Sequence, residues 1–264
     1  MSAAPIIRFS DVVLSMGGVR ICDRLDLDVR PGEFLCILGP SGCGKSTALR
    51  VMSGLLPFES GTVAIDGESP EQRWRDVAFV FQSPRLLPWR SARDNVMLGM
   101  QLRFPERARE EVARRAGELL GMVGLADDGD KFPRMLSGGE RQRVALARAL
   151  AVDPRIILMD EPFSALDPNT RRRMRDELVA LWQQTRKTVV FVTHDVEEAL
   201  VLADRIVLLS PKPTRVVETI ELSRPRPRRI EADPQLAAYR DRLYARFAEL
   251  GSIDATTKEE GLPC

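Results

Sequence analysis

The nine residues from 39 to 47 constrain this chain more than any other segment. They read Gly39-Pro40-Ser41-Gly42-Cys43-Gly44-Lys45-Ser46-Thr47 and stand between an apolar run at 34–38 and a helical pattern at 45–53. A Gly-rich loop between a strand and a helix N-terminus lets backbone N–H groups close around a phosphate; the lysine neutralises phosphate oxygens and the Ser46 hydroxyl can bind Mg²⁺. An ordinary Gly-rich turn is the alternative, and it fits the full pattern and its flanks less well. The sequence therefore predicts a loop that binds ATP with Mg²⁺.

Short runs of β-branched and apolar residues predict buried strands along the chain. The runs are 34–38, 77–81, 156–159, 189–192 and 206–209. Helical stretches at 45–53 and 195–203 closely follow two of them, which indicates an α/β fold with a largely parallel sheet and helices on its faces. Ligands bind at the carboxyl ends of the strands in such sheets.

The character of the sequence changes twice along the chain. Residues 91–152 are charged and rich in Ala, Leu and Arg, which predicts a helical subdomain inserted into a domain that spans 1–222. Residues 223–264 form a separate C-terminal segment, with an extended Arg/Pro linker at 224–229, an amphipathic helix at 233–250 and a frayed end from 252. Contact of the linker arginines with anionic lipid headgroups is the alternative for that part.

Composition excludes several classes of protein. Lys and Arg number 39 against 38 Asp and Glu, a balance unlike that of a protein whose main task is to neutralise nucleic-acid phosphates. No apolar run approaches the roughly 18 residues of a membrane span, and the first residues lack the pattern of a secretion signal, so we expect a cytosolic chain. The spacing of the four cysteines, Cys22, Cys36, Cys43 and Cys264, fits neither a zinc site nor a disulfide framework, which predicts reduced thiols. Cys43 is interpreted as a small space-filling residue, with a reactive thiolate as the alternative.

Two adjacent carboxylates follow the apolar run at 156–159. Asp160 and Glu161 would lie at the carboxyl end of a buried strand, where Mg²⁺ and the γ-phosphate are expected. Asp160 would hold the metal through its water shell, and Glu161 would act as general base on the attacking water. A solvated acidic turn is the alternative, and the apolar strand beside a phosphate loop favours the functional interpretation.

A second glycine-containing helix start lies at Ser137, Gly138 and Gly139, ahead of a helical pattern that stops before Pro154. Such a start suits an anion, although in isolation a simple N-cap followed by glycines is the better explanation. The presence of the two other motifs favours the anion-binding interpretation.

Taken together, the phosphate loop, the signature segment Leu136-Ser137-Gly138-Gly139-Glu140 and the Asp160-Glu161 pair resemble the ATP-binding subunit of an ABC transporter, over residues 6 to about 222. The resemblance implies a P-loop NTPase (RecA-like) parallel sheet core with an N-terminal antiparallel β portion and the inserted helical subdomain. It also implies that two copies meet head to tail. Each ATP would then lie between the phosphate loop of one copy and the signature of the other, with Ser137 and Gly139 at the γ-phosphate.

The resemblance extends to further positions. Gln82 matches the glutamine that senses Mg²⁺ and the attacking water, residues 164–167 match a loop that crosses the dimer, and His194 matches the histidine that holds the γ-phosphate. A structural role is the alternative for this single histidine. The implied catalytic residues are Glu161, His194, Gln82 and Lys45, and the implied metal-binding residues are Ser46, Gln82 and Asp160. Met16 stands where the family usually has an aromatic residue that stacks on adenine, so we expect only modest discrimination between ATP and GTP.

Residues 86–89, Leu-Leu-Pro-Trp, and the segment after Ser223 are similar to importer subunits of the nitrate, sulfonate and taurine group. That likeness implies membrane-spanning permease subunits as partners, an extracytoplasmic solute-binding protein as an indirect partner, no nucleic acid, and a peripheral position on the cytoplasmic face of the membrane. A turn anchored by a buried Trp89 is the alternative for residues 86–89. An exporter subunit and a soluble non-transport ABC ATPase are the alternatives for the whole chain, and the transported solute is left open.

Overall fold

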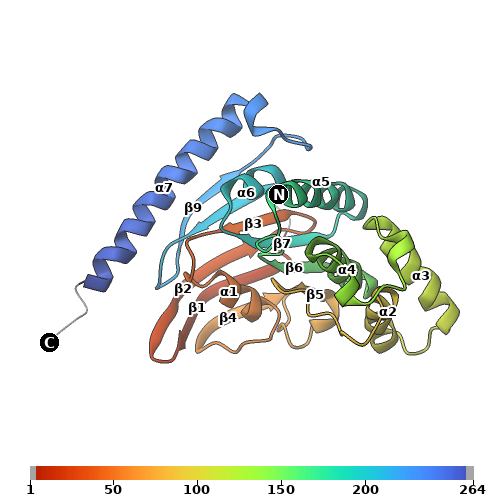
Figure 1. Ribbon diagram of the computed structural model, residues 1–264. Helices are drawn as coiled ribbons and strands as arrows, with labels where there is room; N and C mark the ends of the chain where they lie inside the picture. The colour runs from red at the N-terminus through yellow and green to blue at the C-terminus, as the bar shows by residue number, and fades with distance from the viewer. Residues whose placement is uncertain (1–3, 260–264) are drawn as a thin grey trace. The chain divides into compact units, whose positions relative to one another are not determined.

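The computed structural model describes residues 4–259, and the chain divides into two compact units. The first unit combines the residues up to 73 with those from 188 onward, and the second unit spans 74–187. The N-terminal and C-terminal parts of the first unit are red to orange and cyan to blue in Figure 1, and the second unit is yellow to green.

A parallel sheet forms the core of the first unit. Strand β3 (Phe34–Leu38) lies between β7 (Thr188–Thr193) and β8 (Arg205–Leu209), parallel to both, and β9 (Val216–Glu221) pairs antiparallel with β8. Every residue of β3, β7 and β8 is buried, as expected of parallel strands covered on both faces. Helices α1 (Lys45–Met52) and α6 (Val196–Leu202) pack on these strands. The predicted strands of this unit are confirmed.

The N-terminal part of the first unit is an antiparallel sheet. Strand β1 (Ile7–Met16) pairs with β2 (Val19–Val29) on one side and β4 (Ser60–Ile65) on the other. The turn between β1 and β2 contains only Gly17 and Gly18, both with positive φ, which suits the mirror-image turns of tight hairpins. The predicted antiparallel β portion is therefore confirmed.

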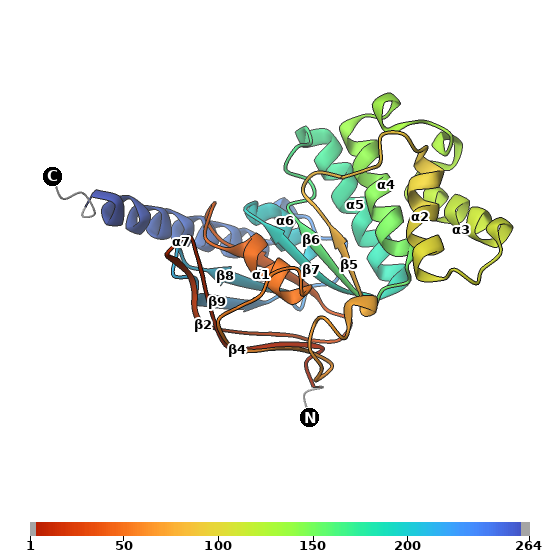
Figure 2. The ribbon, with the colours of Figure 1, turned by 90° about the horizontal axis from the view of Figure 1, so that it is seen from below.

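The second unit combines a pair of parallel strands with four helices. Strand β5 (Val77–Val80) runs parallel to β6 (Ile156–Asp160). Helices α2 (Ala92–Arg103), α3 (Arg109–Met122) and α4 (Gly138–Ala151) pack against one another, and α5 (Pro168–Thr185) lies beside α4 (Figure 2). Residues 91–152 contain helices and short 3₁₀ turns but no strand. Together with the sheets of the first unit, this arrangement confirms the predicted α/β class.

The C-terminal segment contains the predicted helix, but its Arg/Pro part packs on the first unit and the helix is longer than predicted. Arg226 and Arg228 are buried side chains: Arg226 donates to the carbonyl of Leu202, and Arg228 donates to the carbonyls of Leu200 and Ala203. The segment packs because α6 ends here with carbonyls that need donors, and guanidinium groups supply them. Helix α7 (Pro234–Glu259) begins beside α6 and continues past the predicted end at residue 250 (Figure 1). The rest of the predicted frayed end, residues 260–264 with Cys264, lies outside the described residues.

Helix α7 rests on the first unit through a narrow apolar stripe. Leu236, Leu243 and Leu250 recur every seven residues and are buried. Arg242 forms an ion pair with Glu218 of β9 at 2.6 Å. In the described part of the chain, no helix combines the length and apolar character needed to cross a membrane.

Candidate nucleotide site

The phosphate loop, residues 39–47, connects β3 to α1 in the first unit. Lys45, the first residue of α1, is only 4% exposed. Its Nζ donates hydrogen bonds to the carbonyl oxygens of Gly39 at 2.8 Å and Pro40 at 2.9 Å. The ammonium group is therefore held inside the curve of the loop, where a bound phosphate would be neutralised by it.

Two glycines allow the loop to lie tightly against its surroundings. Gly44 has a φ of +113°, and a Cβ there would lie 2.7 Å from Oγ1 of Thr214. A Cβ on Gly39 would lie 2.8 Å from the sulfur of Cys43. No side chain caps the N-terminus of α1, so the helix end that follows Gly44 presents backbone N–H groups of the kind that bind anions.

Thr214 supports the loop from outside the motif, and the sequence did not reveal it. Its hydroxyl donates to the carbonyl oxygen of Cys43, and its backbone N–H donates to the carbonyl of Ile21 at 2.7 Å. Burial raises the pKa of the Cys43 thiol despite the nearby Lys45 ammonium. Cys43 is thus a buried neutral thiol, which favours the interpretation of a space-filling residue over a reactive thiolate.

His194 lies in the first unit between the end of β7 and the start of α6, and its side chain is exposed. The residues on both sides are fixed. The Thr193 hydroxyl donates to the buried Glu198 carboxylate at 2.6 Å, and Asp195 caps α6 by accepting from the backbone N–H groups of Glu197 and Glu198. The backbone on either side of the exposed imidazole is therefore held in place.

Asp160 and Glu161 follow one another at the end of β6 in the second unit. Asp160 is buried, whereas Glu161 is partly exposed and has a φ of +41°. A left-handed backbone is unfavourable for a residue with a side chain, and such strain is concentrated at functional sites. The burial of Asp160 is unlike an ordinary solvated turn, and the catalytic role of the pair stays a prediction.

Gln82, just beyond the end of β5, is joined to the same turn. Its Nε2 donates to Oγ of Ser164 at 3.1 Å, and the Ser164 hydroxyl donates to the Glu161 carbonyl at 3.0 Å. The structure thus brings together Gln82 and Glu161, which are 79 positions apart in the numbering, through a serine that was predicted only as part of a dimer-crossing loop.

The signature segment begins α4 in the second unit. Ser137 caps this helix: its Oγ accepts from the N–H of Glu140 at 3.3 Å, and its own N–H donates to the Glu140 carboxylate at 2.7 Å. These bonds lower the pKa of Glu140. Gly138 is exposed, but a Cβ on Gly139 would lie 2.8 Å from a methyl carbon of Thr170, so a side chain here would displace Thr170. The local structure is therefore a capped helix start, as the simple N-cap interpretation expects. Ser137 and Gly138 remain exposed at this helix N-terminus, where an anion would be favoured.

Residues 83–90, which we call the docking loop, carry an exposed tryptophan. Trp89 is 71% exposed, which contradicts the alternative of a turn anchored by a buried Trp89. The fully buried Asn95 holds the loop from beneath, since its amide donates to the Leu87 and Arg90 carbonyls and its oxygen accepts from the Leu87 N–H. Arg148 of α4 donates to the carbonyl of Pro84 at 2.8 Å. The sequence did not reveal Asn95 or Arg148, because their partners are backbone groups, which no side-chain pattern identifies.

Met16 ends β1 at the hairpin and is 46% exposed. Its partner across the hairpin, Val19, is also exposed. The two side chains form an apolar surface without an aromatic ring, so the expectation of modest base discrimination stays a prediction.

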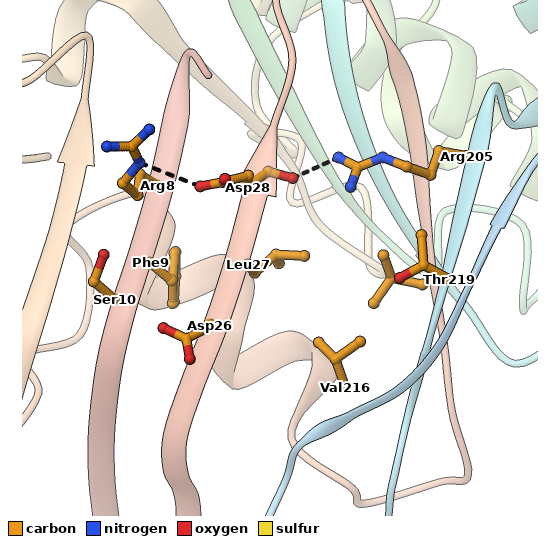
Figure 3. Close-up of a pocket in the computed structure, with 10 residues that line it drawn as sticks. Arg8, Phe9, Ser10, Asp26, Leu27, Asp28, Arg205, Val216 and Thr219 are labelled. Atoms are coloured by element: carbon orange, nitrogen blue, oxygen red, sulfur yellow. Dashed lines mark hydrogen bonds and ion pairs between the residues drawn. The ribbon is translucent and has the colours of Figure 1, made fainter. Parts of the chain in front are cut away.

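A groove of about 510 Å³ lies elsewhere in the first unit, between β1 and β2 on one side and β8 and β9 on the other (Figure 3). Its charged groups are already paired: the Asp28 carboxylate meets Arg8 at 3.4 Å, and the Asp28 carbonyl accepts from Arg205. None of its lining residues belongs to the predicted site.

Binding of Mg²⁺ depends on the side-chain oxygens that the described residues offer. Among them, no group of three or more His, Cys, Asp or Glu side chains could hold a metal ion. Mg²⁺ usually keeps several waters and is bound by one or two protein oxygens together with substrate phosphates. Hydroxyl, amide and carboxylate oxygens, the kinds that Ser46, Gln82 and Asp160 carry, suit that mode of binding, and the role of these residues as ligands stays a prediction.

The strand, phosphate loop and helix, with the buried Lys45, define a P-loop nucleotide-binding protein. Comparison with known proteins narrows this class. A family model described as ABC transporter matches residues 22–164. A taurine import ATP-binding protein from Rhizobium johnstonii is 46% identical over 234 residues, which cover 86% of this chain and 88% of the relative. A nitrate import ATP-binding protein from Synechococcus elongatus is 43% identical over 234 residues, covering 86% and 85%.

Solved structures that resemble this chain are also ATP-binding cassettes. The dimeric structure of a post-hydrolysis state of the ATP-binding cassette MJ0796, bound to ADP and Pi, superposes with a TM-score of 0.74 and 35% identity over 83% of this chain and 99% of that one. The chain therefore belongs to the ABC transporter family, as an ATP-binding and ATP-hydrolysing cassette. This confirms the family predicted from the motifs.

Proposed function

We propose that this chain is the ATPase subunit of an ABC importer that takes up a small solute of the nitrate, sulfonate or taurine kind. The observation that carries the proposal is a match over 86% of the chain to proteins named as taurine and nitrate import ATP-binding proteins. The docking loop lies within residues 22–164, which the ABC transporter family model matches. No specific observation favours an exporter subunit or a soluble non-transport ATPase.

Nucleotide binding is assigned to the first unit. The backbone N–H groups of residues 39–47 would surround the β-phosphate, and Lys45 would neutralise the β- and γ-phosphate oxygens from its position inside the loop. Met16 would pack on the adenine ring. Mg²⁺, bound with the nucleotide through Ser46, Gln82 and Asp160, would neutralise the charge that develops on the phosphates.

Hydrolysis is assigned to Glu161, Gln82 and His194. Glu161 would accept a proton from the attacking water, Gln82 would orient that water, and His194 would donate a hydrogen bond to the γ-phosphate. Phosphoryl transfer depends mainly on positioning and charge neutralisation. The hydrogen bonds that fix the Glu161 turn and both neighbours of His194 supply such positioning.

The complete site is proposed to need two copies of the chain. Ser137 and Gly139, at the exposed start of α4, would bind the γ-phosphate held by the phosphate loop of the other copy, with Gly138 beside them. Support comes from the MJ0796 cassette structure that resembles this chain, which is described as dimeric. Binding of two ATP molecules would close the dimer, and hydrolysis would reopen it.

The docking loop is proposed to receive a helix of a membrane-spanning permease, which would hold the subunit at the cytoplasmic face of the membrane. The exposed Trp89 provides a large apolar anchor of the kind enriched in interfaces. The bonds from Asn95 and Arg148 to the loop backbone keep that anchor in place. An extracytoplasmic solute-binding protein would deliver the solute to the permease.

Purification of tagged Glu161→Gln protein from native membranes in MgATP, followed by mass spectrometry of its companions, tests this proposal. We expect a polytopic membrane protein without an ATPase domain, together with a solute-binding protein. Trp89→Ala in the same background should lose these companions, whereas the exposed Leu102→Ala should keep them. Ribosomal or DNA-bound companions, or no membrane protein at all, would overturn the transport claim.

A further inference from the structure

A chain of hydrogen bonds crosses the second unit from the loop after β5 to the turn after β6. Gln82 Nε2 donates to Ser164 Oγ at 3.1 Å, and Ser164 Oγ donates to the Glu161 carbonyl at 3.0 Å. The Ser164 N–H donates to that same carbonyl at 3.2 Å. One residue therefore binds the side chain of Gln82 and the backbone of Glu161 at once.

The hydroxyl group is suited to this double role, because it can accept and donate at the same time. An alanine at this position would keep only the backbone bond to Glu161 and would lose the link to Gln82. The turn that it holds is strained, since Glu161 has a φ of +41°. A strained residue keeps its conformation only when its surroundings fix it, so the Ser164 bonds bear on where the Glu161 side chain points.

The other contacts of this region extend the chain of bonds toward the docking loop. Gln142 of α4 donates to the Phe81 carbonyl at 3.4 Å, next to Gln82. Arg148 of the same helix donates to the Pro84 carbonyl at 2.8 Å. The backbone on both sides of Gln82 is thus tied to α4, while its side chain reaches Ser164.

We infer that Ser164 is a positioning residue for ATP hydrolysis, which couples the orientation of Gln82 to that of Glu161. The inference rests on the proposed function, since it assigns Gln82 and Glu161 to the attacking water. Ser164 itself touches neither water nor nucleotide in this role. It fixes Gln82 relative to the Glu161 backbone, so that the two groups approach the same water together.

Steady-state ATPase kinetics of the full-length chain test the inference. Ser164→Ala should lower kcat by about 10-fold and change the apparent KM for ATP by less than about 3-fold, because alignment is lost while the binding groups remain. Ser164→Thr keeps the hydroxyl and should retain at least about half of the wild-type kcat. Ser60→Ala removes an exposed hydroxyl at the start of β4 and serves as the matched control with unchanged activity.

A double-mutant cycle separates coupling from general damage. If Ser164 acts through Gln82, the Gln82→Ala and Ser164→Ala double variant should have a kcat within about 2-fold of the worse single variant. Losses that multiply would show that the two residues act independently and would overturn the inference. So would a Ser164→Thr variant as slow as Ser164→Ala. If Ser164→Ala fails to fold, Ser164→Cys, which keeps the volume but bonds weakly, replaces it in the cycle.

The failure of this inference can be distinguished from the failure of the proposed function. Wild-type protein without ATPase activity would refute both. Wild-type activity that is lost in Glu161→Gln but preserved within about 2-fold in Ser164→Ala would leave the proposed function intact and overturn the role of Ser164.

Discussion

The predicted site is divided between two units that hold their functional residues in different ways. In the first unit, the phosphate loop is buried: Lys45 bonds to carbonyls of its own loop, and Gly39 and Gly44 are pressed against neighbouring atoms. In the second unit, Gln82 and Ser137 are exposed, and Glu161 is partly exposed on a strained backbone. The first arrangement is enclosed by its own backbone and by Thr214, whereas the second presents side chains that are accessible to a ligand or a partner.

From this difference we expect that ATP binding and ATP hydrolysis can be separated by mutation. The proposed function assigns phosphate binding to the loop, which is held by bonds within the first unit. It assigns the partly exposed carboxylate of Glu161 and the exposed amide of Gln82 to the attacking water, where they would act on the reaction more than on affinity. Substitutions in the two units should therefore affect different kinetic constants.

The largest effect is expected for Glu161→Gln. Loss of the general base should reduce kcat by on the order of 100-fold or more, while the dissociation constant for ATP changes by less than about 3-fold. Single-turnover hydrolysis and fluorescent-nucleotide titration measure the two quantities. A parallel loss of affinity would contradict the division between the units.

The converse effect is expected for Lys45→Ala. Removing the buried ammonium group should weaken ATP binding by roughly 2–5 kcal/mol, the range for truncating one member of a buried charge pair. Equilibrium titration with nucleotide measures the change, and the exposed Arg50→Ala on the same helix is the matched control. An unchanged affinity would mean that the phosphate is bound elsewhere.

A smaller effect on stability is expected for Arg228→Ala. Arg228 is 6% exposed, and its guanidinium donates to four backbone carbonyls. These are the carbonyls of Leu200, Ala203, Leu222 and Arg224, which the substitution would leave unpaired. The loss should be about 3 kcal/mol in the free energy of unfolding, measured with urea. The exposed neighbour Arg229→Ala should change it by less than about 0.5 kcal/mol. Equal effects of the two substitutions would show that the segment does not brace the first unit.

The smallest effect concerns the pH dependence of the first unit. Burial raises the pKa of the Cys22 thiol from 9.0 to about 11. Because the folded state holds the proton more tightly, this stabilising contribution is complete below pH 9 and is lost as the pH rises toward 11. The difference in unfolding free energy between wild type and Cys22→Ala should therefore fall by up to about 2 kcal/mol across that window. A difference that does not change with pH would refute the burial of a neutral thiol.

Local patterns and long-range bonds differ in how far the sequence predicts them. The strands β3, β7 and β8 and the phosphate loop follow from local patterns, because apolar runs and glycines determine structure over a few residues. The links made by Ser164, Arg148 and Thr214 do not, because each pairs a polar or charged residue with a partner far along the chain. The C-terminal segment shows the same limit: its arginines and prolines predict a solvated linker by composition, and only the nearby end of α6 gives Arg228 its buried partners.

The central claim is that ATP joins two copies of this chain through the phosphate loop of one and the signature segment of the other. Sedimentation velocity of the Glu161→Gln variant, with ADP and then with saturating MgATP, tests that claim most directly. The account predicts a monomer in ADP, a dimer in MgATP, and loss of the dimer when Ser137→Arg is added at the start of α4. A Glu161→Gln protein that binds MgATP yet remains monomeric would contradict it.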